Sequence, residues 1–358
     1  MSSKVNLTVD DFDPIVAYSN YDEWTTPNPQ DNPTWFNASQ DVTGSQWHQA
    51  TYHLTTVSGA QASFNFTGNG LWVYGGTGTS PNYTITLDSS SSQPFTSSYS
   101  TPNLTDGRTL LYGTDQLAYA EHQLVLTNHG DGLLLDLIVV GVELGGDSAT
   151  LANTTLDDRA SELQYSGSWT QQTGPNFYNQ TSTYTGGPGP YFELNFTGSA
   201  VYIYGDQVND HGPYSVYIND TNVATHTGRS GCGGGYAKYC EKVHGLAFFA
   251  GSLPEGQHTL RLVNEGPSSG NTTYFDFDYL EYTVPSVYSS QTVESASCPF
   301  TNCTSASAAS TSGTATTGAA GQSSSTAEAK SSAGLPTSAS NAALLAVAGT
   351  WLLRKFIN

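Results

Sequence analysis

Hydrophobic and polar residues alternate along short stretches of the chain, and two such stretches are nearly identical. Residues 64–74 read FNFTGNGLWVY, and residues 194–204 read LNFTGSAVYIY. In the first, Phe64 and Phe66 flank Asn65, which gives the two-residue period of a strand with one buried face. The TGNG run that follows is typical of a turn. Each stretch therefore predicts two adjacent antiparallel strands.

The similarity between the two halves extends over most of the first 285 residues. Five blocks recur in the same order. Each half opens with a strand that carries paired Asp residues (Asp10 and Asp11, Asp157 and Asp158), followed by a Trp (Trp24, Trp169) and the NFTG strand pair. Each half then has an HxLxLxN strand (residues 122–128, 258–264) and a closing strand with a central Asp (Asp136, Asp278). Such an ordered recurrence indicates an internal duplication. Short strands between Gly, Pro, Ser and Asn loops favour sandwiches. We therefore predict an all-β protein with two tandem antiparallel β-sandwich domains, repeat 1 (residues 1–146) and repeat 2 (residues 147–285).

The composition changes after repeat 2. Residues 286–332 are dominated by Ser, Thr and Ala, which cannot bury a core, so we predict a disordered stalk suited to O-glycosylation. Residues 333–358 contain the apolar run AALLAVAGTWLL, which is too short to cross a bilayer. Small residues, a short polar spacer and an apolar tail resemble a GPI-attachment signal, so we predict a hydrophobic C-terminal anchor signal that attaches the protein to a membrane. A truncated membrane span or a plain hydrophobic C-terminus are the alternatives.

The charge balance is strongly acidic. The chain has 30 Asp and Glu against 10 Lys and Arg, for a formal net charge of −20. Such a chain repels phosphate backbones, so we do not expect nucleic acid as a partner. Only 11% of the residues are charged, and most of the polarity comes from hydroxyls and amides. This composition is typical of secreted β proteins.

The cysteines and the N-glycosylation sequons both point to an oxidising, secretory route. The four cysteines form two close pairs, Cys232 with Cys240 and Cys298 with Cys303, without zinc-site spacing, so we predict local disulfides and leave other pairings open. The N-terminus lacks the apolar segment of a signal peptide, and we expect the start to be incomplete. Eleven sequons are present: Asn6, Asn37, Asn65, Asn82, Asn103, Asn153, Asn179, Asn195, Asn219, Asn271 and Asn302.

Catalytic motifs are absent from the sequence. It contains no GxSxG, HExxH, P-loop or EF-hand pattern, and the glycine-rich segment GRSGCGGGYAKYC lacks the context of a phosphate loop. Carboxylates are abundant, but no pair is singled out for glycoside hydrolysis. We therefore predict a protein that is not an enzyme, and keep a carbohydrate-active hydrolase or accessory module as an alternative.

Acidic residues recur at the first and last strands of each repeat. Because such strands often lie close together in a sandwich, their oxygens could gather around a structural calcium ion, the one cofactor we expect. The alternative is that these carboxylates cap or face outward from their strands. The candidate ligands are Asp10, Asp11, Asp136, Asp157, Asp158 and Asp278.

Aromatic and basic residues supply candidates for ligand contacts. Tryptophans at a sandwich rim suit the apolar face of a sugar ring, whereas Trp72 and Tyr202 lie mid-strand and suit packing. The Cys232–Cys240 loop has Arg229, Lys238 and Lys242 within fourteen residues on an otherwise acidic protein, which favours either a contact site or an ordered surface loop. The candidate ligand-binding residues are Trp24, Trp35, Trp47, Trp169, Arg229, Lys238 and Lys242.

The strand motifs carry a family resemblance. The NFTG strand pair, the HxLxLxN strand and the closing strand with its central Asp resemble galactose-binding-like jelly-roll domains, in particular the tandem copies of fungal cell-surface proteins with a Ser/Thr-rich stalk and an anchor. The resemblance covers residues 5–285 and the tail arrangement. It implies carbohydrate binding at loops on one sandwich edge, often with a structural calcium, but transfers no defined sugar site.

These observations favour a non-catalytic cell-surface glycoprotein that binds glycans or mediates adhesion. We expect glycans or cell-wall polysaccharide as partners, and a location on the extracellular face of the cell surface or in the cell wall. A structural cell-wall spacer without a specific ligand is the second hypothesis, and the carbohydrate-active hydrolase is the third.

Overall fold

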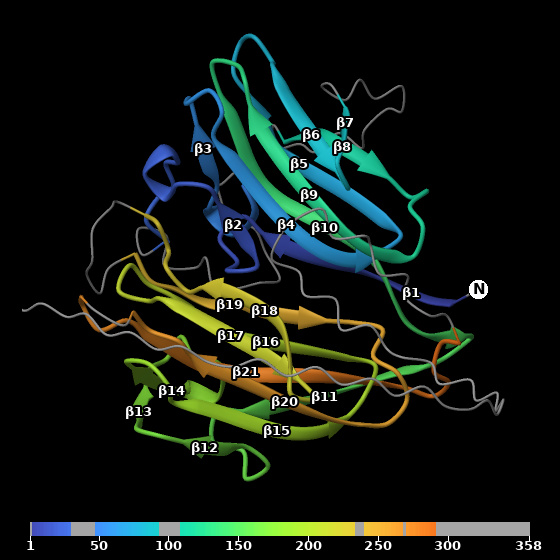
Figure 1. Ribbon diagram of the computed structural model, residues 1–358, viewed down its shortest axis with the longest axis vertical. Helices are drawn as coiled ribbons and strands as arrows, with labels where there is room; N and C mark the ends of the chain where they lie inside the picture. The colour runs from blue at the N-terminus through green and yellow to red at the C-terminus, as the bar shows by residue number, and fades with distance from the viewer. Residues whose placement is uncertain (1, 30–46, 93–107, 233–239, 268–269, 291–358) are drawn as a thin grey trace, which may run out of the picture. The chain divides into compact units, whose positions relative to one another are not determined.

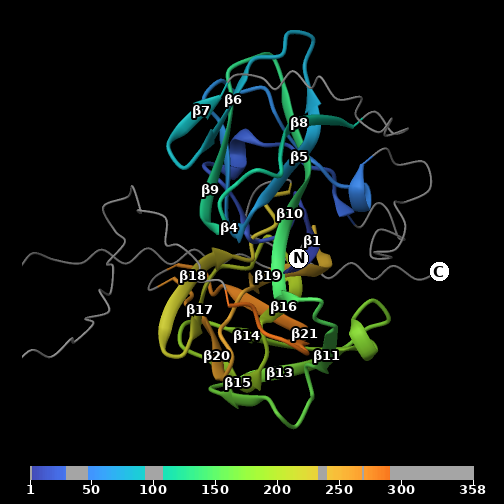
Figure 2. The ribbon, with the colours of Figure 1, turned by 90° about the vertical axis from the view of Figure 1, so that its right-hand side faces the viewer.

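Strands make up almost all of the regular structure (Figure 1 and Figure 2). The computed structural model describes residues 2–29, 47–92, 108–232, 240–267 and 270–290. In these residues every strand ladder is antiparallel, and the strands form four sheets. The prediction of an all-β protein built from antiparallel sheets is confirmed.

Repeat 1 contributes two of the sheets. One has the order β1-β10-β5-β8, with β3 also paired to β10: β1 (Ser2–Asp10), β10 (Leu133–Asp147), β5 (Gly70–Thr77), β8 (Thr109–Thr114) and β3 (His53–Thr55). The other has the order β2-β4-β9-β6-β7: β2 (Val16–Tyr18), β4 (Gln61–Gly68), β9 (Ala120–Asn128), β6 (Tyr83–Leu87) and β7 (Ser90–Ser92).

Repeat 2 contributes the other two sheets. One has the order β13-β14-β21-β16-β19, with β11 also paired to β21: β13 (Trp169–Thr173), β14 (Thr181–Gly186), β21 (Tyr274–Pro285), β16 (Ala200–Gln207), β19 (Lys242–Ala250) and β11 (Leu151–Asp157). The other has the order β12-β15-β20-β17-β18: β12 (Gln164–Ser166), β15 (Tyr191–Thr197), β20 (Gln257–Asn264), β17 (Pro213–Ile218) and β18 (Thr221–Thr227).

The strand order of the first two sheets recurs in the second two, and so do individual contacts. Short 3-10 helices occupy matching places before β3 and β14, as η3 (His48–Ala50) and η4 (Tyr178–Gln180), whereas η1 (Tyr21–Glu23) follows β2. The Tyr18 hydroxyl donates to the Asp11 carbonyl at 2.6 Å, and the Tyr165 hydroxyl donates to the Asp158 carbonyl at the same distance. The duplication therefore extends from topology to side-chain hydrogen bonds.

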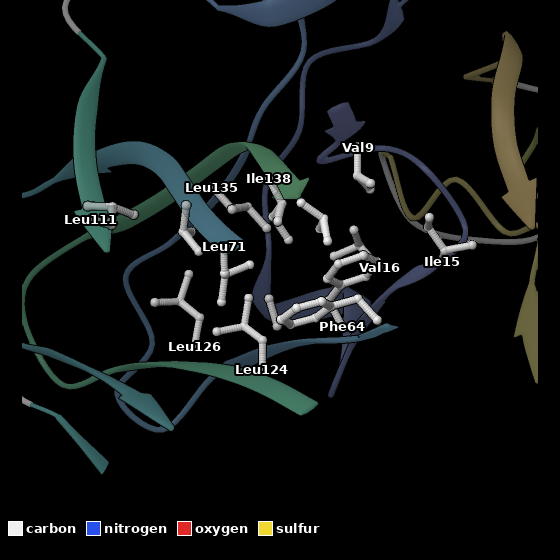
Figure 3. Packing of buried hydrophobic residues seen from close by; sticks show 14 of the residues in the cluster. Val9, Ile15, Val16, Phe64, Leu71, Leu111, Leu124, Leu126, Leu135 and Ile138 are labelled. Atoms are coloured by element: carbon white, nitrogen blue, oxygen red, sulfur yellow. The ribbon is translucent and has the colours of Figure 1, made fainter. Parts of the chain in front are cut away.

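Each pair of sheets encloses a hydrophobic core. In repeat 1, Phe64 of β4 and Leu124 of β9 meet Leu71 of β5 and Ile138 of β10 (Figure 3). In repeat 2, side chains such as Phe192 of β15 pack in the same way against the facing sheet. The exposed and buried residues of β4 alternate along its length, as the sequence pattern predicts. Each large side chain buried in this way contributes about 1.5–3 kcal/mol.

Residues 1–303 form one compact unit, and a buried ion pair joins the two repeats within it. The Lys242 ammonium at the start of β19 lies 2.9 Å from the Asp10 carboxylate at the end of β1 and 3.9 Å from Asp13. The Leu246 amide donates to Asp13 at 2.9 Å. Because Lys242 is fully buried, its charge must be balanced by these carboxylates.

The predicted stalk and anchor signal lie outside the described residues, apart from residues 286–290. Among the described residues, none belongs to a helix with the length and apolar character needed to span a membrane.

Candidate functional site

A cavity of about 300 Å³ opens in repeat 2, beside the sheet that contains β14, β21 and β16. Its walls come from three neighbouring strands, from β13 and from the loop that follows β16. The lining residues are Gln172, Tyr184, Asp206, Val208, Asp210, His211, Tyr274 and Asp276.

Strand register brings these residues together. Tyr184 of β14 lies directly opposite Asp276 of β21. On the other side of β21, Gly205 of β16 pairs with Phe277, the residue that follows Asp276. An added Cβ at Gly205 would lie 2.1 Å from the Asp276 carbonyl oxygen, so glycine allows β16 and β21 to approach here. Because Phe275 and Phe277 point into the core, the alternation of β21 turns the Asp276 side chain to the other face, toward the cavity.

The loop after β16 holds His211 between two carboxylates. Its Nε2 lies 2.9 Å from Asp206 Oδ1 and its Nδ1 lies 3.1 Å from Asp210 Oδ1. Burial alone would lower the pKa of His211, but the charge of Asp206 and the hydrogen bonds to Asp206 and Asp210 outweigh it and raise that pKa to about 10. His211 is therefore an imidazolium at neutral pH, and it balances part of the acidic charge.

Asp276 is the carboxyl group of the cavity that lacks a cation. Desolvation by burial, together with the charge of Asp206, raises its pKa well above 3.8, although His211 and the Ser182 hydroxyl act in the opposite direction. Gln172 Nε2 donates to Asp276 Oδ2. Asp276 Oδ1 is buried and has no hydrogen-bond partner among the described residues. The hydrogen-bonding capacity of this oxygen is therefore unused among the described residues.

Two tyrosines add flat apolar surface to this polar group. Tyr184 and Tyr274 are half-buried, and their ring centroids lie 6.4 Å apart in an edge-to-face arrangement. Their rings line the cavity together with the carboxylates and an amide. The site therefore combines hydrogen-bonding groups of fixed orientation with aromatic faces, a combination that orients a small polar ligand.

Repeat 1 carries different residues at the matching places. Gly75 of β5 pairs with Leu135 of β10 as Gly205 of β16 pairs with Phe277 of β21. Asp206 and Asp276 consequently correspond to Gly76 and Leu134, which pair with each other. Neither carboxyl group has a counterpart in repeat 1.

The sequence reasoning missed this site. It did not single out Asp206, His211 or Asp276. The signal that could have found them is the difference between repeats, because Asp206 follows a YG pair whose counterpart in repeat 1 is followed by Gly76.

The basic residues Arg229 and Lys242, which flank the cysteine pair, both contact residues of repeat 1. The predicted Cys232–Cys240 disulfide is present, with Cα atoms 5.8 Å apart, and it packs against Phe12 of repeat 1. Lys242 is fully buried in its ion pair, so its assignment as an exposed ligand contact is wrong. The Arg229 guanidinium lies 5.9 Å from the centre of the Tyr21 ring. Arg229, Lys242 and the disulfide therefore help to join the repeats.

The tryptophan predictions are corrected in part. Trp24 is 5% exposed and packs edge-on against Tyr18 in the core of repeat 1, so it cannot offer its face to a sugar. Trp169 is half-buried against Tyr165, and its indole N–H donates to the Ser166 carbonyl at 3.0 Å. Trp47 is half-buried beside Tyr52 and lies away from the cavity lining.

The predicted calcium ligands do not fit an ion in this structure. In repeat 1, Asp10 pairs with Lys242, Asp11 contacts His53 Nδ1 at 2.6 Å, and Asp136 pairs with Arg108. In repeat 2, hydroxyl and backbone donors occupy Asp157, Asp158 and Asp278. Among the described residues, no group of three or more His, Cys, Asp or Glu side chains could hold a metal ion. The carboxylates that were assigned to calcium serve hydrogen bonds and ion pairs instead.

The described sequons all lie on the surface. Trp35, Lys238, Cys298, Cys303, Asn37, Asn103 and Asn302 fall outside the described residues. The remaining sequon asparagines are exposed: Asn6, Asn65, Asn82, Asn153, Asn179, Asn195, Asn219 and Asn271. Their exposure is what N-glycosylation requires, and their modification stays a prediction.

Comparisons with known proteins give partial matches. No protein-family model matches the chain. An "A type blood alpha-D-galactosamine galactosaminidase" of Flavonifractor plautii is 29% identical over 174 residues, which is 49% of this chain and 15% of the enzyme. An "A type blood N-acetyl-alpha-D-galactosamine deacetylase" of the same organism is 31% identical over 127 residues, 36% of this chain and 14% of the enzyme. The chain thus spans only a small part of the curated relatives it matches.

Matches to solved structures are weaker. A Paenibacillus xanthan lyase has 14% sequence identity and a TM-score of 0.26, over 75% of this chain and 25% of the lyase. The ANXUR1 extracellular domain from Arabidopsis thaliana has 14% identity and a TM-score of 0.24, over 69% of this chain and 85% of that domain. TM-scores at this level do not establish a common fold.

Proposed function

We propose that this protein is a non-catalytic, glycan-binding ectodomain of a cell surface, built from two tandem galactose-binding-like β-sandwiches. The cavity of repeat 2 is the glycan site. The observation that carries the proposal is the convergence of Tyr184 and Tyr274 with buried carboxyl groups around one opening of about 300 Å³. That volume is at the lower end of small-molecule sites, and it suits a sugar ring better than a long polymer segment.

The chemistry of the cavity matches what a sugar offers. A pyranose has apolar C–H faces that pack on aromatic rings and hydroxyl groups that hydrogen-bond to planar acceptors and donors. Gln172, Asp206 and Asp276 supply such acceptors and donors, and their own contacts hold them in place. Preorganised polar groups cost little to order when a ligand binds.

The named relatives support a glycan ligand of the same kind. Both are enzymes whose names refer to galactosamine glycans, and the similarity covers 15% and 14% of their own lengths. We propose a shared glycan preference and not a shared reaction, since most of either enzyme lies outside the similarity.

Surface display belongs to the same proposal. The eight exposed sequons fit a secreted glycoprotein, and the predicted stalk of residues 286–332 would hold the repeats away from a membrane or wall. The anchor signal of residues 333–358 would attach the protein to the membrane. Glycans or cell-wall polysaccharide are the proposed partners.

The test is a glycan-array and calorimetric comparison of the purified protein with two matched variants. Tyr184→Ala removes a ring from the cavity, and Leu54→Ala truncates the residue at the same strand position of repeat 1, since both lie opposite matched residues of the closing strands. We expect glycan binding by the wild type, at least tenfold weaker binding by Tyr184→Ala, and unchanged binding by Leu54→Ala. Binding of no glycan would favour the structural spacer, and release of sugar products would favour the hydrolase.

A further inference from the structure

The charge of the cavity restricts which sugars it can accept. Three carboxyl groups, those of Asp206, Asp210 and Asp276, face one cation, His211. None of the lining residues is Lys or Arg. A uronic or sialic acid would bring a further negative charge into this group, and like charges in a partly buried site cost free energy. Anionic sugars are therefore disfavoured.

The unpartnered oxygen of Asp276 indicates which chemical group a ligand would bring to the cavity. Asp276 is 4% exposed and lines the cavity, and its Oδ1 has no hydrogen-bond partner among the described residues. A buried carboxyl oxygen without a donor is costly, and a charged donor satisfies it better than a neutral one. A ligand ammonium would give Asp276 both a hydrogen bond and the counter-charge that Asp206 already obtains from His211.

The aromatic residues of the cavity also favour a ligand with an ammonium group. Tyr184 and Tyr274 present ring surfaces to the cavity, and ring faces attract an ammonium group in addition to packing on apolar sugar carbons. A neutral hydroxyl at the same place would gain neither the ring attraction nor the counter-charge.

We propose that the cavity of repeat 2 recognises a hexosamine with a free, protonated amine, and that Asp276 is the residue that selects the amine over a hydroxyl or an acetamide. This inference rests on the proposed glycan-binding function. It also implies one amine-selective site per chain in the described residues, because repeat 1 carries Gly76 and Leu134 at the positions of Asp206 and Asp276.

The experiment varies only the group at C2 of the sugar. Methyl α-D-galactosaminide, methyl N-acetyl-α-D-galactosaminide and methyl α-D-galactoside are titrated into the full-length protein at neutral pH, with the matching glucose-configured series in parallel. We expect the amine of at least one series to bind tenfold or more tightly than its hydroxyl analogue, because a charge-assisted hydrogen bond replaces a neutral one.

Three variants separate the selectivity from the fold. Asp276→Asn keeps the shape of the side chain, and we expect it to reduce the amine preference to within twofold while binding of the hydroxyl sugar persists. Asp206→Asn serves as a second cavity variant if Asp276→Asn does not fold, with a weaker amine preference expected. Asp220→Asn makes the same charge change on an exposed residue of repeat 2, and it should keep the full preference.

The outcomes distinguish this inference from the function on which it rests. Equal or tighter binding of the hydroxyl or acetamide sugar by the wild type would overturn the amine selectivity and leave glycan binding intact. An unchanged preference in Asp276→Asn and Asp206→Asn would overturn the role of the carboxyl groups. Failure of every sugar in both series would instead contradict the proposed function itself.

Discussion

Asp206 and Asp276 stand where repeat 1 carries Gly76 and Leu134, although the strands around them follow the same order in both repeats. Two substitutions therefore give repeat 2 a pair of buried carboxyl groups at a place where repeat 1 has a glycine and a leucine. The cost of burying them is offset by His211 for Asp206 and, in our account, by a ligand for Asp276. At the scale of single residues, the difference between repeats is a difference in charge.

The buried ion pair between the repeats gives a prediction on stability. Replacing Lys242 with Met leaves Asp10 and Asp13 buried without their cation, so we expect the free energy of unfolding to fall by about 3–5 kcal/mol. The matched control is Lys4→Met, because Lys4 is 57% exposed and lies 3.8 Å from Glu143. That change should cost about 1 kcal/mol or less. Urea unfolding of both variants is the measurement, and equal losses would contradict the role of Lys242.

The Asp278 carboxyl predicts a dependence of stability on pH. Burial, with the charges of Asp206 and Asp158, raises the pKa of Asp278 from 3.8 to about 8, despite the Tyr178 amide that donates to it. The folded state therefore holds a proton that the unfolded chain has released between about pH 4 and pH 8. Within that window the free energy of unfolding falls as pH rises, by up to about 1.4 kcal/mol per pH unit.

Comparison of the wild type with Asp278→Asn isolates this effect. The variant cannot titrate, so its free energy of unfolding should fall less steeply between pH 5 and pH 8 in urea titrations at each pH. The pKa of His211 is raised from 6.5 to about 10, so the folded state also keeps the His211 proton at pH values where the unfolded chain has lost it. The free energy of unfolding should therefore continue to fall with pH in both proteins up to about pH 10. Parallel pH profiles for the two proteins would show that Asp278 is ionised in the folded state.

At the scale of elements, the strands follow from local sequence more readily than the site does. The alternation of Phe64, Asn65 and Phe66 predicts the two faces of β4 correctly, because the side chains of a strand point to opposite faces wherever it lies. The cavity could not be predicted in this way. Asp206 and Asp276 are 70 residues apart in sequence and meet only through the pairing of β16 with β21.

The errors have a related cause. Trp24 was a candidate for stacking on a sugar at a sandwich rim, but η1 places it next to Tyr18, where its ring packs in the core of repeat 1. Lys242 was a candidate ligand contact because it is one of three basic residues around the Cys232–Cys240 loop, but the pairing of β19 with β16 places it at the junction with Asp10. In both cases tertiary packing decided the environment of the side chain.

The disulfide-closed segment gives a prediction at this scale. Cys232 and Cys240 are separated by eight positions, and their bridge packs on Phe12 across the junction. Replacing both with Ser should lower the free energy of unfolding by roughly 2–3 kcal/mol, because a short loop loses its covalent closure. A reducing agent should bring the wild type down to the same stability. Free thiols at both positions in unreduced peptides of the native protein would contradict the assignment.

At the scale of the whole molecule, each repeat has its own pair of sheets, and the junction between the repeats combines the Lys242 ion pair with apolar contacts of Ala200 and Leu246 against the core of repeat 1. We expect fragments 1–146 and 147–290 each to show β-type circular dichroism and cooperative unfolding, since each contains both of its sheets. Each should have a lower unfolding midpoint than the full chain, because separation removes the contacts of Lys242 and Leu246 with repeat 1. A fragment that stays unfolded would show that the halves depend on one another to fold.

The predicted anchor is tested in a cell that supplies a signal peptide. If residues 333–358 act as a GPI-attachment signal, the surface protein should be released by phosphatidylinositol-specific phospholipase C and should end near residue 334. Mass spectrometry of the mature protein checks the new C-terminus. A peptide that contains Trp351 in the mature surface protein would contradict the GPI assignment and favour a membrane span.

The central claim, a glycan site in the cavity of repeat 2, is tested most directly by a crystal structure of the protein with a bound sugar. Crystals soaked with the methyl glycoside that binds most tightly in calorimetry should show the sugar ring in the cavity, packed against Tyr184 or Tyr274, with a polar group of the ligand within hydrogen-bond distance of Asp276 Oδ1. The same sugar bound at another surface, with the cavity filled only by water, would contradict the account.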